Sequence, residues 1–116
     1  MKKLLLLVCL FAISMMQAQD KKQPTYEIDG NLVKATYYHE DGAVEKQGYF
    51  KNKKLTGEWT QFDKKGNKIT IGYYKNGKKV GKWCVWNNGL LTEINYKDNI
   101  IASVNTQKQK TSVAIN

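Results

Sequence analysis

The middle of the chain repeats itself. Residues 48–71 align with residues 72–94 at an offset of 24 positions, a weaker copy lies at 35–47, and a shortened copy lies at 95–101. The residues matched between the two best copies are glycines and aromatics: Gly48 with Gly72, Gly57 with Gly81, Trp59 with Trp83, and Phe62 with Trp86. Self-similarity at a fixed period of this length predicts a repeat architecture, in which each unit packs only against its neighbours.

Turn signals occur twice in each period. Asp41-Gly42, Asn76-Gly77 and Asn88-Gly89 are pairs favoured in tight hairpins, because both central residues tolerate left-handed backbone angles. Between the turns lie short runs rich in β-branched and aromatic residues, such as LVKATYY and KITIGYY. No sustained helical stripe occurs after residue 20. We therefore predict an all-β fold: a single elongated antiparallel meander of about seven or eight strands, with one hairpin per repeat.

The glycines are expected to have structural roles. One group belongs to the turns: Gly42, Gly66, Gly77 and Gly89. A second group is expected to let large rings lie over a neighbouring strand: Gly48, Gly57, Gly72 and Gly81. In the copy at 48–71, Lys53 stands where the other copy has its turn glycine.

The first residues have the layout of a secretory signal peptide. Met1-Lys2-Lys3 is positive, residues 4–16 are apolar, and the chain turns polar at Asp20. This apolar run is shorter than the roughly 20 residues that span a bilayer as a helix. We therefore expect a protein exported to the periplasm, the outer surface or the exterior, with no transmembrane segment in the mature chain. The predicted divisions are a signal peptide (1–19), a lead-in with the first strand (20–32), a repeat sheet (33–104) and a polar tail (105–116).

The chain is strongly basic, with 19 lysines, no arginine and 10 acidic residues. Proteins that read nucleic acids favour the planar fork of arginine, so its absence and the predicted export argue against a nucleic-acid partner. The lysines crowd into residues 51–82, where they could attract an anionic membrane or polysaccharide. The candidates for anionic contact are Lys51, Lys53, Lys54, Lys75, Lys78, Lys79 and Lys82. Lysine-rich turns could equally serve to keep an open sheet soluble.

The aromatic residues offer a second candidate surface. They stand at adjacent as well as alternate strand positions, and adjacent side chains point to opposite faces of a sheet. Some rings should therefore be exposed, where they could bind a protein partner, a glycan or a lipid headgroup, although they could also serve only to fill a thin core. The candidate binding face is Trp59, Phe62, Tyr73, Tyr74, Trp83 and Trp86.

The motif in GYYKNGKKVGKW resembles the MORN repeat. The pattern aromatic-x-Asn-Gly-Lys-x-x-Gly-x-aromatic is similar in particular to the bacterial variant found in exported proteins and in chains labelled antitoxin components of toxin–antitoxin systems. The resemblance covers about residues 33–101 and is strongest at 72–89; MORN repeats usually have a further glycine where Trp59 and Trp83 stand. It implies a hairpin-built sheet that binds membranes or proteins and does not catalyse a reaction. Chains of this kind also carry the label nicotinic acid mononucleotide adenylyltransferase, whose His-x-Gly-His pair this chain lacks.

Three groups of residues could be drawn as catalytic or ligand sites. Gly77 and Gly81 resemble a phosphate loop, but three residues instead of four separate them and a helix is not expected to follow. His39 has no second His or Cys at a metal-ligand spacing. Glu45 and Glu58 could flank a sugar only across a cleft, which a thin sheet does not provide.

The sequence therefore predicts no catalytic site, metal or cofactor. Removal of the signal peptide would take Cys9 with it and leave Cys84 without a disulfide partner. We expect a non-catalytic protein-binding or scaffold module. Electrostatic binding through the lysine-rich turns is the first alternative. The second is an antitoxin-like component or a chain mislabelled as a nucleotidyltransferase, whose catalytic motif is not seen here.

Overall fold

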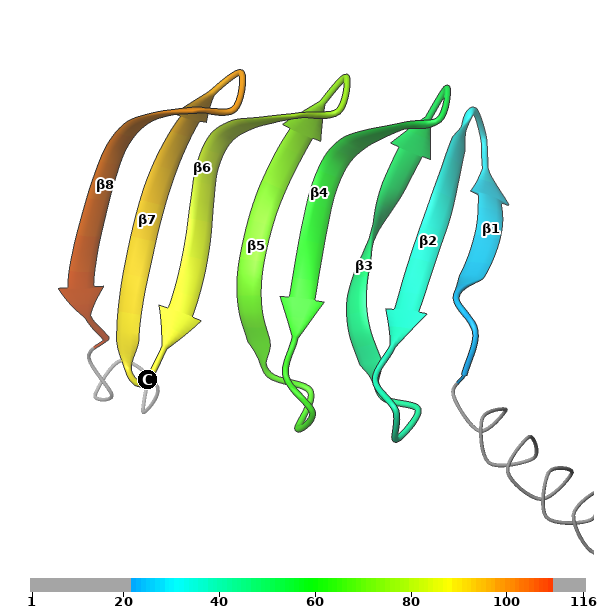
Figure 1. Ribbon diagram of the computed structural model, residues 1–116, viewed down its shortest axis with the longest axis horizontal. Coiled ribbons are helices and arrows are strands. Elements are labelled where there is room, and N and C mark those ends of the chain that lie inside the picture. The colour runs from blue at the N-terminus through cyan, green and yellow to red at the C-terminus, as the bar shows by residue number, and fades with distance from the viewer. Residues whose placement is uncertain (1–21, 110–116) are drawn as a thin grey trace, which may run out of the picture.

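The computed structural model describes residues 22–109, which form one antiparallel sheet (Figure 1). The predicted signal peptide, Cys9 and the end of the polar tail lie outside the described residues. The strands are β1 (Thr25–Asp29), β2 (Leu32–Tyr38), β3 (Val44–Lys51), β4 (Lys54–Phe62), β5 (Lys68–Lys75), β6 (Lys78–Asn87), β7 (Leu90–Lys97) and β8 (Ile100–Lys108).

Each strand pairs with the next strand in the chain, so the order is β1 to β8 without a crossover. The predicted meander of consecutive hairpins is confirmed. β8 runs through Lys108, so the sheet continues past residue 104, where the sequence places the start of the tail. Eight strands at about 4.8 Å spacing make a ribbon roughly 35 Å across.

Left-handed backbone angles close the tight turns. Asn76 has φ 51° and Gly77 φ 80°, while the equivalent pair Asn52 and Lys53 has φ 50° and 66°. Both central residues of a two-residue hairpin turn with this twist need positive φ, which explains the Asn-Gly sequence. Lys53 carries a side chain in a region that costs a non-glycine residue about 1–2 kcal/mol.

We therefore expect Lys53→Gly to raise the free energy of unfolding by about 1 kcal/mol, because glycine adopts this angle without a Cβ penalty. Urea denaturation measures the change. The reciprocal substitution Gly77→Lys should lower stability by a similar amount, and equal effects of the same sign at both positions would contradict this explanation.

Asp63 organises the turn between β4 and β5. Its carboxylate accepts hydrogen bonds from the backbone N–H groups of Asn67 and Lys65, both at 2.9 Å. The N–H of Asn67, followed by its side-chain amide and the N–H of Lys65, lowers the pKa of Asp63 because these donors favour the ionised form, against a smaller opposing effect of desolvation.

A carboxyl with a lowered folded-state pKa stabilises the fold above its unfolded pKa, and this contribution disappears as the pH falls through the folded value. The stability difference between the wild type and Asp63→Ala should therefore be larger at about pH 7 than at about pH 2. Denaturation at the two pH values measures it, with Lys64→Ala as the control in the same turn. A pH-independent difference would show that the carboxylate charge contributes nothing.

The strands β4 and β6 bend at a glycine. Between β3 and β4, Gln47 pairs with Thr60 but Tyr49 pairs with Thr56, so β4 has extra residues at this point. Gly57 lies in this irregularity with φ 65°, and Gly81 occupies the same place in β6 with φ 69°. Figure 1 shows these strands turning sharply near the hairpins.

The bend brings each hairpin turn against the preceding hairpin. The N–H of Gly77 donates to the carbonyl of Leu55 at 2.9 Å, and the N–H of Asn99 donates to the carbonyl of Lys79 at 2.9 Å. Positions 55 and 79 are equivalent in the repeat, so neighbouring units are joined by backbone hydrogen bonds in addition to the strand ladder.

The sheet is a single layer, and within residues 22–109 most side chains of its central strands are half-buried. The buried hydrophobic residues are Ala35, Trp83 and Leu91. Several of the most exposed hydrophobic side chains belong to the edge strands, including Ile28 in β1 and Ile100 in β8. Stability must therefore come mainly from contacts between neighbours within each face.

Candidate binding face

One side of the sheet carries a continuous row of aromatic rings, which we call the aromatic face. Its rings are Tyr26, Tyr37, Phe50, Trp59, Tyr74, Trp83 and Tyr96. Contacting rings have centroids 5.1 to 6.5 Å apart. Most pairs meet edge to face, an arrangement that the ring quadrupole favours.

Two glycines allow the indole rings to lie flat on the sheet. A Cβ at Gly48 would overlap the ring of Trp59, and a Cβ at Gly72 would overlap the ring of Trp83. Each indole N–H donates to a backbone carbonyl at 3.2 Å, that of Trp59 to Tyr49 and that of Trp83 to Tyr73. The position of each indole ring is therefore fixed by two features. The glycine beneath it leaves room for the ring, and the hydrogen bond of its N–H holds its edge.

Gly57 and Gly81 differ from the expectation that they also make room for rings. A Cβ at either position would meet nothing within 4 Å, and both residues have positive φ. Both glycines instead form the bend in their strand, which requires a left-handed backbone angle.

The six rings predicted to share a binding face are divided between the two faces. Trp59, Tyr74 and Trp83 belong to the aromatic face, whereas Phe62, Tyr73 and Trp86 point to the opposite side, which we call the polar face. The division follows from strand alternation, because Tyr73 and Tyr74 are neighbours and Trp83 and Trp86 are three residues apart. Four further rings complete the row and were not in the predicted face: Tyr26, Tyr37, Phe50 and Tyr96. Tyr26 precedes the first copy, Tyr37 and Tyr96 lie in the weak copies, and Phe50 lies in one of the two best copies.

The seven candidate lysines do not form one patch. Lys79 crosses the aromatic face, with its Nζ 4.9 Å from the Trp83 ring and 5.2 Å from the Tyr96 ring. Lys82 lies on the polar face and pairs with Glu93 at 3.3 Å. The other five lie in or beside two turns at the same end of the sheet: Lys51, Lys53, Lys54, Lys75 and Lys78.

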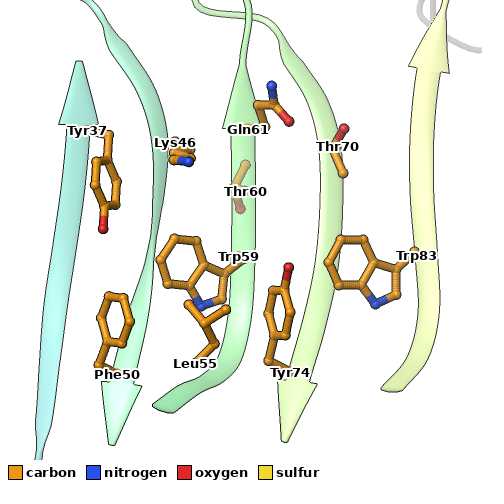
Figure 2. Close-up of a pocket in the computed structure, with 10 residues that line it drawn as sticks. All are labelled: Tyr37, Lys46, Phe50, Leu55, Trp59, Thr60, Gln61, Thr70, Tyr74 and Trp83. Atoms are coloured by element: carbon orange, nitrogen blue, oxygen red, sulfur yellow. The ribbon is translucent and has the colours of Figure 1, made fainter. Parts of the chain in front are cut away.

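A hollow of roughly 280 Å³ opens over Trp59 (Figure 2). The rings of Tyr37, Phe50, Tyr74 and Trp83 also line it, and Leu55 borders it at the end nearer the lysine-rich turns. Polar side chains border the other end: Lys46, Gln61 and Thr70. We call this feature the Trp59 hollow.

The carboxylates of the described strands all avoid the aromatic face. Strand register directs them to the polar face: Glu27, Asp29, Glu45, Glu58 and Glu93. The remaining carboxylates of residues 22–109 lie in turns: Glu40, Asp41, Asp63 and Asp98. The charged side chains of the aromatic face are therefore lysines, and Lys46 lies 4.9 Å over the ring of Tyr37.

Partial burial raises the pKa of two tyrosines in the aromatic row, Tyr37 and Tyr74. Burial is the main cause that raises the pKa of Tyr74, with the nearby Tyr96 adding to the effect. Burial, followed by the hydrogen bond and charge interaction with Tyr26, raises the pKa of Tyr37. Both phenols therefore stay neutral at physiological pH and contribute no negative charge to this face.

The residues considered as catalytic or metal-binding candidates, His39, Glu45 and Glu58, do not form a common site. His39 is half-buried, and its Nε2 lies 2.9 Å from the carbonyl oxygen of Phe62, which links two neighbouring turns. Lys46 pairs with Gln61, so Glu45 lies beside Phe62, about 13 Å along β4 from Glu58. That separation exceeds the 6.5–9.5 Å of inverting glycosidases.

Gly77 and Gly81 belong to a turn and a bend between strands, without a helix terminus to hold phosphate. Cys84 is half-buried and is the free cysteine of the described region. Within residues 22–109, His, Cys, Asp and Glu side chains do not gather in a group of three that could hold a metal ion. The same residues contain no helix long and apolar enough to cross a membrane.

Comparisons with protein-family models, with curated proteins and with solved structures give no match to this chain.

Proposed function

We propose that this chain is a non-catalytic repeat protein that binds a protein partner through its aromatic face. It would act as an exported scaffold at the cell envelope or outside the cell, as the resemblance to the MORN variant and the signal-like N-terminus imply. The observation that carries the proposal is a row of mostly half-buried rings with an open hollow at Trp59, flanked by lysines and free of carboxylates in the described strands. Exposed apolar patches with a polar rim are typical of protein interaction sites.

Two positions on β4 provide a matched test. Gln61 is exposed on the aromatic face beside Trp59, and Glu58 is exposed on the polar face of the same strand. A photoreactive amino acid at Gln61 should crosslink to a protein of the cell envelope, and the same amino acid at Glu58 should not. The crosslink should persist at about 0.5 M salt, where charges are screened within a few ångströms.

Crosslinking from Glu58 alone would place the partner on the polar face and contradict the proposal. A product seen only at low salt would assign the attachment to charge, and it would then favour the second candidate function.

The second candidate is electrostatic attachment to an anionic membrane or polysaccharide. It is favoured by the five lysines that gather in two turns at one end of the sheet. A lysine near an anionic membrane surface contributes about 1 kcal/mol. Replacing the five lysines by glutamine should abolish binding to vesicles that contain anionic lipid if this candidate is right, and should leave the Gln61 crosslink intact if the first is right.

A further inference from the structure

The two best repeat units differ beside the indole ring of the aromatic face. Position 55 in β4 is leucine, and the equivalent position 79 in β6 is lysine. Both residues accept a hydrogen bond from the next hairpin turn through the backbone carbonyl, so the backbone is held in the same way at the two sites. At this position the two units therefore differ in the side chain that borders the indole ring and not in the backbone.

In the unit of β6, the space over the indole is filled. The Nζ of Lys79 lies over Trp83 and Tyr96, and only 8% of Trp83 is exposed. In the unit of β4, the ring pair Trp59 and Tyr74 has a similar geometry, with centroids 6.1 Å apart at 81°, against 5.6 Å and 72° for Trp83 and Tyr96. Leu55 is shorter than lysine, and the Trp59 hollow remains open beside it.

The hollow has an apolar end and a cationic end. Phe50 and Leu55 lie at one end, and Lys46 lies at the other with Gln61 and Thr70 (Figure 2). Lys46 is exposed, and the strand carboxylates of the described residues lie on the opposite face of the sheet. An incoming group that combines an apolar body with a negative charge complements both ends.

Standing rings limit the shape of the occupant. Phe50 meets the Trp59 ring at 89° and 5.5 Å on the β3 side, and Tyr74 meets it at 81° and 6.1 Å on the β5 side. A rigid polymer that ran across the strands would collide with these rings, whereas a single side chain directed into the hollow would not. A protein anchor residue therefore fits better than a linear polysaccharide.

We infer that the Trp59 hollow receives one aromatic or aliphatic side chain of a protein partner, with a neighbouring carboxylate of that partner beside Lys46. The inference rests on the proposed function and names the chemistry of the partner: an acidic segment with an apolar anchor. Interfaces commonly concentrate their affinity in one such buried anchor.

N-acetyl-phenylalanine is the probe, because it combines a ring with a carboxylate, and N-acetyl-phenylalaninamide is its neutral control. Nitrogen–proton NMR of the purified protein reports the indole N–H of Trp59, Trp83 and Trp86 as separate signals. The acid should shift the Trp59 signal and leave the Trp86 signal unchanged, and the amide should bind several-fold more weakly. Lys46→Gln should remove the difference between the two probes.

Two substitutions at the equivalent positions sharpen the test. Leu55→Phe fills the hollow without adding charge and should abolish the Trp59 response, while an unchanged Trp86 signal shows that the variant is folded. Lys79→Leu should open a second hollow, so that the Trp83 signal shifts more than it does in the wild type. An unchanged Trp59 response in Leu55→Phe, or no response in the wild type, would overturn the inference.

The same spectra separate the other occupants. A larger Trp59 shift with oligogalacturonate than with N-acetyl-phenylalanine would assign the hollow to an acidic sugar and reject the protein anchor. If the Gln61 crosslink forms but is equally strong in Leu55→Phe, the proposed function stands and the hollow is not the anchor site. If no crosslink forms from position 61 even when Leu55 is retained, the proposed function itself is rejected.

Discussion

Replacing Gly72 by alanine should lower the free energy of unfolding by about 3 kcal/mol, at the upper end of the usual cost of overpacking. The added Cβ would overlap the indole carbons of Trp83, which lies directly on the glycine. The indole cannot move aside easily, because its N–H is bonded to the carbonyl of Tyr73 and its ring is enclosed by Tyr74 and Tyr96. Urea denaturation of the wild type and the variant measures the loss.

A double-mutant cycle identifies the cause. In a Trp83→Ala background the collision partner is gone, and Gly72→Ala should then cost less than about 1 kcal/mol or even stabilise, because alanine restricts the unfolded chain more than glycine does. An equal cost of Gly72→Ala in both backgrounds would show that the indole is not the reason for the glycine. Gly48→Ala should behave in the same way with Trp59, whose ring covers Gly48.

Replacing Trp83 by alanine should cost about 3–5 kcal/mol, the usual range for a buried tryptophan. Trp83 is one of the few buried hydrophobic residues of the described sheet, and its ring contacts Tyr74 and Tyr96 and lies under Lys79. Because residues 22–109 form a single layer, no apolar side chain of a second layer lies over the space that the ring leaves. Thermal or urea unfolding measures the effect.

Tyr73→Ala is the control for the loss of a large ring in a neighbouring strand. Tyr73 is 41% exposed on the polar face, so its replacement should cost about 1 kcal/mol or less. If the two substitutions cost the same, the aromatic face would not be the main source of packing in this sheet.

The hairpin order was predictable because it depends on local signals. Asn-Gly pairs and β-branched runs recur along the chain, and each acts within a few residues. Even the exception, Lys53 in place of glycine, kept the same turn, since its neighbour Asn52 and the flanking strands impose the left-handed angle.

The composition of the binding face was not predictable in the same way. Parity within one strand shows which side chains share a face, but matching that face to the next strand needs the register, which shifts between Tyr37 and Tyr38 and between Gln61 and Phe62. The six predicted rings therefore combined members of two faces. The sequence shows leucine at position 55 and lysine at position 79. It does not show that both side chains border an indole ring, so the hollow could not be predicted from it.

The central claim is that a protein partner covers the aromatic face of this single-layer sheet. Hydroxyl-radical footprinting of the native protein, with and without the cell envelope, measures the solvent access of each tryptophan. Trp59 should become protected when the partner is present, while Trp86 on the polar face should be oxidised at an unchanged rate. Protection of Trp86 without protection of Trp59, or no change at either ring, would contradict the claim.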